Sequence, residues 1–154
     1  MTETLFEHAG GAPALLALAR AHHARCLADP VLNHPFSHPG QHPQHIERLA
    51  AYWGEALGGP PEYSQHCGNQ TDLLVIHAGH GDMSDLARRF VDCFVAAADD
   101  AGLPDDAPFR AALRGYMEWA VQEFNAHPSG AHTVPSHAPV PRWGWDGLEA
   151  SGHG

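Results

Sequence analysis

Basic side chains are scarce in this sequence. Its 154 residues include no lysine and only 8 arginines, against 18 aspartates and glutamates, so the formal net charge is −10 at pH 7 with neutral histidines. Such a surface repels phosphate backbones and anionic lipid headgroups. We therefore expect neither nucleic acid nor a membrane among the partners of this chain.

Cysteine is also scarce, because Cys26, Cys67 and Cys93 form an odd set without a Cys-x-x-Cys pair. This pattern excludes a disulfide framework and suits a reducing compartment. No basic residue precedes Arg20, and the apolar run at residues 12–19 is too short to cross a bilayer. The sequence therefore predicts a cytoplasmic protein without a signal peptide or a transmembrane helix.

Strand-forming residues are few, and no stretch shows the alternation of a half-buried strand. Apolar residues recur instead at three- and four-residue spacings, which indicates four helices at about residues 12–27, 43–57, 84–101 and 108–124. We expect loops at residues 31–42, which are rich in Pro and His, and at the irregular residues 62–83. The length and the 44% hydrophobic content predict one all-α domain.

Histidine is the abundant residue, with 14 copies, and it invites a metal site. The sequence contains no His-Glu-x-x-His motif and no Glu-x-x-His motif, which argues against a zincin and against a di-iron bundle. A non-haem metalloprotein that uses the His38/His42/His45 cluster, such as a zinc or iron hydrolase, stays open as the alternative. A helical interaction protein without a cofactor is a further option.

Haem requires less of a sequence than these metal sites, since one neutral imidazole on an apolar wall is enough to hold the iron. His77 follows the apolar residues 73–76 and precedes the third helix, which offers Phe90 and Phe94 as large apolar cover. This arrangement makes His77 the candidate iron ligand.

The order of several motifs along the chain is specific. Two glycines precede the first long helix, Asp-Pro closes it, an aromatic follows, and a Gly-Gly-Pro turn with a later tyrosine comes after the second long helix: Gly10-Gly11, Asp29-Pro30, Phe36, Gly58-Gly59-Pro60 and Tyr63. From His77 to Gly102-Leu103-Pro104 the spacing has no gap. In these features the chain resembles the truncated haemoglobins, group II most closely, over residues 5–126.

The resemblance implies a fold and a division of the chain. The fold is the truncated globin, a 2-on-2 helical sandwich, here with a C-terminal extension. Residues 1–127 would form the globin domain, and residues 128–154 a Pro-, Gly- and His-rich extension. We expect this extension to dock partly on the body through Trp143 and Trp145.

The resemblance also implies the site. His77 is the proximal ligand of the iron in haem b (iron protoporphyrin IX), and Arg48 lies near a haem propionate. The expected contacts with the cofactor are Phe36, His45, Arg48, Leu49, Tyr52, Trp53, Tyr63, Ile76, His77, Phe90 and Phe94. The chain departs from the family on the distal side, where His23 replaces a tyrosine, Phe90 replaces a tryptophan and His45 takes a position that is often small.

The implied function is the binding of diatomic gases, O2, CO or NO, opposite His77. A distal imidazole at His45 or His23 would donate to the bound gas, or act as general base and acid toward hydrogen peroxide. Redox activity, either peroxidase-like or NO dioxygenation, requires an electron donor that the sequence does not identify. The sequence leaves a homodimer open. It also leaves open whether His22, His23 or His45 faces the iron, and whether His45 or His23 closes the sixth coordination site.

Overall fold

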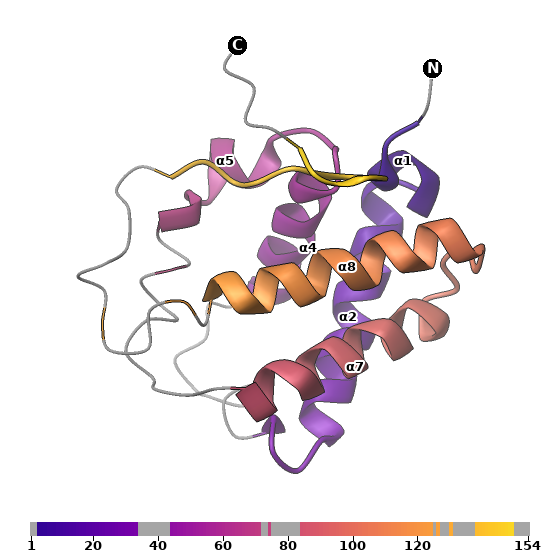
Figure 1. Cartoon of the computed structure of the whole chain (residues 1–154), viewed down its shortest axis with the longest axis vertical. Coiled ribbons are helices and arrows are strands. Elements are labelled where there is room, and N and C mark those ends of the chain that lie inside the picture. Colours follow the sequence, from indigo (N-terminus) through magenta and orange to yellow (C-terminus); the bar gives the residue numbers. More distant parts are fainter. Residues whose placement is uncertain are drawn as a thin grey trace.

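The computed structural model describes residues 3–33, 44–71, 74, 84–124, 126, 130 and 138–149. Within these ranges the chain forms six helices and one short hairpin, which confirms the all-α prediction (Figure 1). No helix in the described part of the chain is long and apolar enough to cross a membrane.

Four long helices make the body. They are α2 (Ala12–Ala28), α4 (His45–Ala56), α7 (Ser84–Asp100) and α8 (Ala107–Phe124), and each lies within two residues of its predicted bounds. α2 packs against both α4 and α7, and α7 packs against α8. The pair α7 and α8 lies across the pair α2 and α4, which is the predicted two-over-two arrangement (Figure 1).

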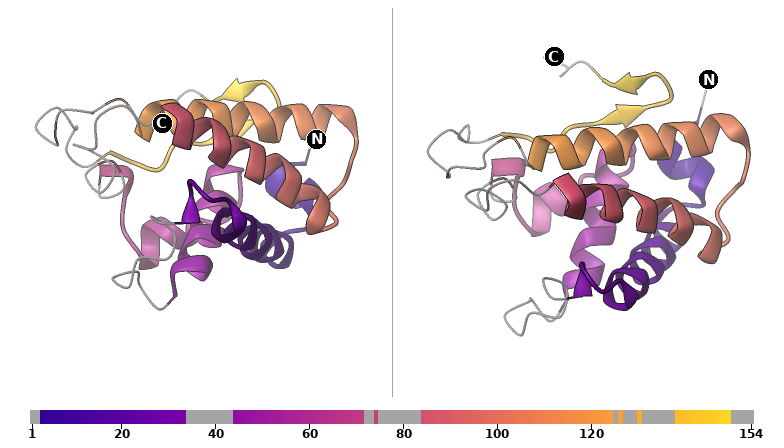
Figure 2. Two further views of the ribbon diagram at one scale, coloured as in Figure 1. Left: turned by 90° about the horizontal axis from the view of Figure 1, so that it is seen from below. Right: turned by 60° about the horizontal axis from the view of Figure 1, so that its bottom comes forward.

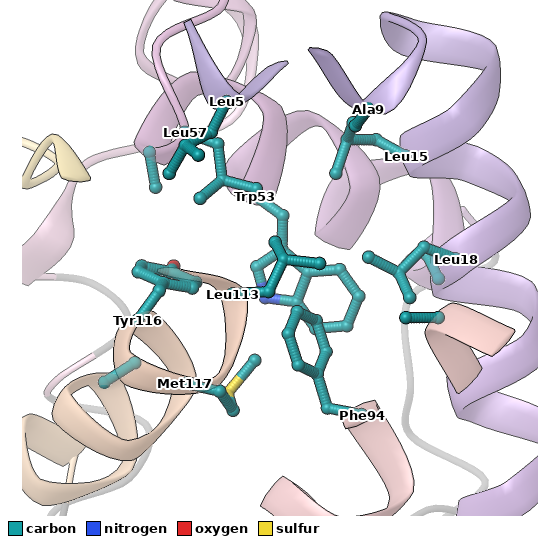
Figure 3. Packing of buried hydrophobic residues seen from close by; sticks show 14 of the residues in the cluster. Leu5, Ala9, Leu15, Leu18, Trp53, Leu57, Phe94, Leu113, Tyr116 and Met117 are labelled. Atoms are coloured by element: carbon teal, nitrogen blue, oxygen red, sulfur yellow. The ribbon is translucent and has the colours of Figure 1, made fainter. Parts of the chain in front are cut away.

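The core lies where these two pairs cross. Its centre is built from large side chains of every long helix, with Leu18, Trp53, Phe94 and Leu113 all at most 2% exposed (Figure 3). Burial of these apolar residues is the main favourable term that holds the helices together.

A short helix that the sequence analysis did not predict, α1 (Leu5–Ala9), precedes the body. Its signal is a capping box, in which the Thr4 hydroxyl accepts from the Glu7 amide and the Glu7 carboxylate accepts from the Thr4 amide. Gly10 and Gly11 then turn the chain into α2 with φ of 119° and 79°, values that favour glycine.

The prediction of a loop over residues 62–83 is wrong at its start, where α5 (Glu62–His66) forms. The buried carboxylate of Glu55 accepts hydrogen bonds from the Ser64 amide at 2.8 Å and from the Ser64 hydroxyl. Because this anchor comes from the preceding helix, the local sequence of α5 does not show it.

The expectation of no strands is also wrong in one place. β1 (Trp143–Gly144) and β2 (Gly147–Leu148) pair antiparallel, with Trp143 opposite Leu148. Strands of two residues are too short to show an alternating pattern. The hairpin lies over α8 (Figure 2), and the Trp143 ring packs 6.0 Å from Tyr116 and 5.6 Å from Trp119.

His8 joins three parts of this end of the molecule. Its Nδ1 lies 2.6 Å from the Glu3 carboxylate and its Nε2 lies 2.9 Å from the Asp106 carboxylate, while its ring packs 5.1 Å from Trp145. Ionised carboxylates can only accept hydrogen bonds, so both ring nitrogens of His8 must donate. His8 is therefore an imidazolium in this arrangement. The hydrogen bonds to Asp106 and Glu3 raise the pKa of His8 above its ordinary value.

We expect this contact to make stability depend on pH. The stabilisation is complete below the ordinary histidine pKa of 6.5 and is lost as the pH rises through the raised folded pKa. The free energy of unfolding of the wild type, measured in urea, should therefore fall by about 1 kcal/mol or less between pH 6 and pH 9, because partly exposed ion pairs contribute little. His8→Leu should lack this component, and an equal loss in both proteins would contradict it.

Candidate functional site

His22 lies on the inner face of α2 with no exposed surface. Its Nε2 donates to the Phe90 carbonyl at 3.2 Å, and its ring lies 4.3 Å from the Phe90 ring and 5.4 Å from the Trp53 ring. Cys26, one turn further along α2, places its sulfur 3.8 Å from Nδ1. His22 is thus a core histidine that joins α2 to α4 and α7.

Burial lowers the pKa of His22 from 6.5 to about 4, outweighing the hydrogen bond to Phe90, which raises it. The folded chain therefore keeps His22 neutral at pH 6, where the unfolded chain is substantially protonated at this residue.

We expect His22 to make the apoprotein acid-labile. A depressed folded pKa contributes stability that is present above pH 6.5 and is lost as the pH falls toward 4. The loss for this residue is about 3 kcal/mol over that interval. His22→Phe should flatten the acid limb of a plot of unfolding free energy against pH. His66→Phe, at an exposed histidine of α5, is the matched control that should not.

His23, the next residue on α2, points elsewhere, because neighbours on a helix are about 100° apart. Its ring lies 5.7 Å from the ring of His45, the first residue of α4. The structure thus brings together the two histidines that the sequence analysis assigned to the distal side. Both are partly buried.

His45 has an unusual environment. Its Nε2 is buried and has no hydrogen-bond partner among the described residues. Burial, followed by the neighbouring charge of His23, lowers the pKa of His45, and Glu47 only partly opposes this. The imidazole is therefore neutral at pH 7, with a buried ring nitrogen left to receive or donate a proton.

A second polar group lies between α4 and the chain after α5. The Tyr52 hydroxyl donates to the Gln70 side chain at 2.6 Å, and the Tyr52 ring lies 5.3 Å from the ring of Tyr63. All three residues are at most 5% exposed. Burial raises the pKa of Tyr52 beyond its ordinary range, so its hydroxyl stays protonated and donates.

The predicted cofactor contacts on the described helices fall into separate groups. Trp53, Phe90 and Phe94 surround His22, with Phe94 4.9 Å from Trp53. Leu49 is half-buried at the edge of the core, and Arg48 donates to the Cys67 carbonyl at 3.4 Å.

Other predicted site residues lie outside the described part of the chain. These are Phe36, Ile76 and His77, together with His38 and His42 of the alternative metal site. The described residues contain no group of three His, Cys, Asp or Glu side chains that could hold a metal ion. Gln70 is the polar residue that the sequence analysis missed, because it lies in a stretch predicted as an irregular loop and no local motif marks it.

Comparison with known proteins gives one family and several solved structures. The profile of the bacterial-like globin family matches residues 4–127. Comparison with curated protein sequences finds no match.

The solved structures are bacterial haemoglobins. Haemoglobin from the thermophilic phototrophic bacterium Chloroflexus aurantiacus is 26% identical with a TM-score of 0.67, over 80% of this chain and 98% of that one. The thermostable haemoglobin of the actinobacterium Thermobifida fusca is 28% identical with a TM-score of 0.65, over 79% and 96%. Truncated oxygen-avid haemoglobin from Bacillus subtilis shares the fold at 22% identity and a TM-score of 0.64, over 79% and 98%.

Proposed function

The chain belongs to the bacterial-like globin family, and from that premise we propose that it binds haem b with His77 as the proximal ligand and a diatomic gas on the opposite side. The fold, shared with truncated haemoglobins, supports this proposal, as does the position of His77 after the apolar residues 73–76.

The observation that carries the proposal is the buried Nε2 of His45 without a partner among the described residues. Buried polar atoms in folded proteins are nearly always hydrogen-bonded, so an exception requires an explanation. A site that receives a small polar ligand explains it, because the nitrogen is then satisfied when the ligand is present. The residues present therefore fit a haem-bound ligand at this position.

The remaining residues would hold the cofactor. Leu49 and Phe90, which are only half-buried, would supply apolar cover from α4 and α7, and Phe36 and Ile76 are expected to add to it. Trp53 and Phe94, also predicted as contacts, pack around His22 in the core. Arg48 would pair with an anionic propionate. When bound, the haem would supply an iron centre that takes O2, CO or NO and exchanges one electron.

The distal histidines would hydrogen-bond to the bound ligand. A neutral imidazole donates from one ring nitrogen and accepts at the other. The ring of His23 near His45 disfavours a positive charge on His45, which supports a neutral, hydrogen-bonding imidazole there.

The same pair favours a second candidate function, which is redox catalysis of the peroxidase type. Neutral His45 Nε2 would take a proton from hydrogen peroxide and return it to the leaving oxygen. NO dioxygenation is the other redox option, and both require an external electron donor.

We expect His45→Leu to lower peroxide turnover by about 100-fold or more, in line with the loss of a general acid–base group. His23→Leu should have a smaller effect, because it changes only the neighbour of His45. Turnover is measured by oxidation of a chromogenic reductant at saturating haem, with His66→Leu as the matched surface control. Unchanged turnover in both distal variants would remove the distal-histidine mechanism.

His45 or His23 would compete with external ligands if one of them also bound the iron. The absorption spectrum of the resting ferric protein decides between a six-coordinate low-spin state and a water-bound or five-coordinate state. If the resting protein is six-coordinate and low-spin, His45→Leu or His23→Leu should convert its spectrum to that of the water-bound or five-coordinate state.

Titration of the apoprotein with haemin tests the proposal against the alternative His38/His42/His45 metal site. The globin proposal expects one haem per chain and an intense Soret band. The alternative expects no stable haem complex and one tightly bound zinc or iron ion per chain.

A further inference from the structure

Residues 138–149, named here the C-terminal strap, run along the body and end in the hairpin of β1 and β2 (Figure 1). At the start of the strap, the Ala138 carbonyl accepts from the Gln70 amide at 3.0 Å. Further along, Arg142 donates to the Gly59 carbonyl at 3.4 Å. Backbone amides and guanidinium groups make these contacts, and neither kind of group changes its charge between pH 6 and pH 9.

The hairpin end of the strap is held differently, because Trp145 rests on His8 of α1. Trp145 Nε1 donates to the Glu3 carbonyl at 2.8 Å, and the indole ring lies 5.1 Å from the His8 ring. Phe109 of α8 contacts both rings, at 4.9 Å from His8 and 6.2 Å from Trp145. The His8 imidazole is therefore part of the surface on which the hairpin end docks.

Two carboxylates fix the His8 ring in place. Nδ1 lies 2.6 Å from the Glu3 carboxylate, in the chain before α1, and Nε2 lies 2.9 Å from the Asp106 carboxylate, in the chain before α8. Among the described residues these are the charged groups that act on His8, and the strap contributes none. The orientation of the ring under Trp145 therefore depends on a proton at each ring nitrogen.

Loss of one of these protons weakens the support of Trp145. A neutral imidazole donates from one nitrogen only, so one of the two carboxylates would face a lone pair and would no longer be held. The Glu3 side chain is 53% exposed and can turn to water, and the Glu3 carbonyl is the acceptor of the Trp145 indole. Release of either carboxylate also frees the imidazole ring against which the indole packs.

We propose that protonation of His8 controls the docking of the hairpin end of the C-terminal strap. Residues 143–148 dock tightly when His8 is an imidazolium and open more readily when it is neutral, while the start of the strap stays attached at Ala138. Opening would uncover Tyr116 of α8, whose ring lies 6.0 Å from the ring of Trp143. The strap is then a hinged cover that responds to pH.

The direction of the response follows from the two hydrogen bonds. Those to Asp106 and Glu3 raise the pKa of His8 above the ordinary 6.5. His8 is therefore charged at pH 6 and becomes neutral as the pH rises through the raised value, so the hairpin end opens on the alkaline side.

Solvent exchange of the Trp145 indole N–H, measured by NMR on the full chain between pH 6 and pH 9, tests the proposal. The protection factor, which corrects for the intrinsic pH dependence of exchange, should fall roughly fivefold, the effect of one hydrogen bond. Trp145→Phe identifies the signal by removing it. The Gln70 amide, at the start of the strap, is the internal reference and should keep its protection factor.

Three variants separate His8 from other titrating groups. In His8→Leu the protection of Trp145 should not depend on pH. Asp106→Asn keeps the ring and removes one charge that raises the pKa of His8, so the fall should shift to lower pH. His66→Leu, at an exposed histidine of α5, is the matched control and should behave like the wild type.

A wild type whose Trp145 protection factor is equal at pH 6 and pH 9 would overturn the proposal. An undiminished fall in His8→Leu would do the same, as would an equal fall at Gln70, because the chain would then open as a whole. Asp106→Asn decides the matter if His8→Leu fails to fold, since an unshifted fall in that variant would exclude His8 as the titrating group.

Discussion

Replacing His77 with alanine is expected to abolish stable haem binding. In this proposal His77 supplies the proximal imidazole, and without it only apolar contacts from α4 and α7 would remain, with no bond from that side to the metal. Changes in residues that orient a metal ligand without touching the metal cost about 10–100-fold in affinity, so loss of the ligand itself should exceed that range. Titration with haemin, followed at the Soret band, measures the effect.

His66→Ala is the matched control for this prediction. His66 lies on α5 with two-thirds of its side chain exposed and pairs only with Glu62 in the described part of the chain. The haem affinity of the His66→Ala variant should equal that of the wild type. Imidazole added to His77→Ala should restore part of the binding by filling the vacated position. A variant that retains wild-type affinity and a wild-type spectrum would mean that another residue holds the iron.

Replacing Phe94 with alanine is expected to cost about 3–5 kcal/mol of unfolding free energy, the range for a large aromatic removed from a core. Phe94 has no exposed surface, and its ring lies 4.9 Å from Trp53 and 6.0 Å from His22. It therefore joins α7 to both α4 and α2 at the crossing of the helix pairs (Figure 3). The cavity left by the ring would remove contacts on three helices at once.

Urea unfolding of the apoprotein measures this change without interference from the cofactor. Phe94→Leu, which keeps most of the apolar volume, should lose much less stability than Phe94→Ala. Leu148→Ala, at a leucine that is 52% exposed, should stay within about 0.5 kcal/mol of the wild type. If Phe94→Ala unfolds like the wild type, Phe94 does not hold the core as described.

The four long helices could be predicted because their signals are local. Apolar residues such as Trp53 and Leu113 recur at helical spacing and are buried. Gly102, at φ 72°, ends α7 as its position in the sequence indicates. The four long helices lie where the apolar spacing predicts them, although Leu49 and Phe90 are only half-buried.

Two contacts that could not be predicted join separate segments of the chain. α5 is anchored by Glu55, nine residues before Ser64, and the strap binds Gln70 through Ala138. Neither partner carries a motif. Pairings of this kind become visible only when the fold brings the two segments together.

The site shows the same division. Helical geometry indicates that His22 and His23 face different neighbours, and the structure places the first in the core and the second beside His45. The burial of His22 and the lowered pKa of His45 could not be predicted from the sequence. The first depends on Trp53 of α4 and Phe90 of α7, and the second on burial and on His23 of α2. The roles proposed for Phe36, Ile76 and His77 stay predictions, since these residues lie outside the described part of the chain.

The absorption spectrum of the purified protein, recorded ferric and then reduced under carbon monoxide, tests the central proposal most directly. A globin with one proximal imidazole predicts a Soret band in the ferric state that sharpens and shifts when a stable ferrous carbon monoxide complex forms. Reconstituted protein that gives no such complex, or no Soret band at all, would contradict the assignment of His77 and of the haem site.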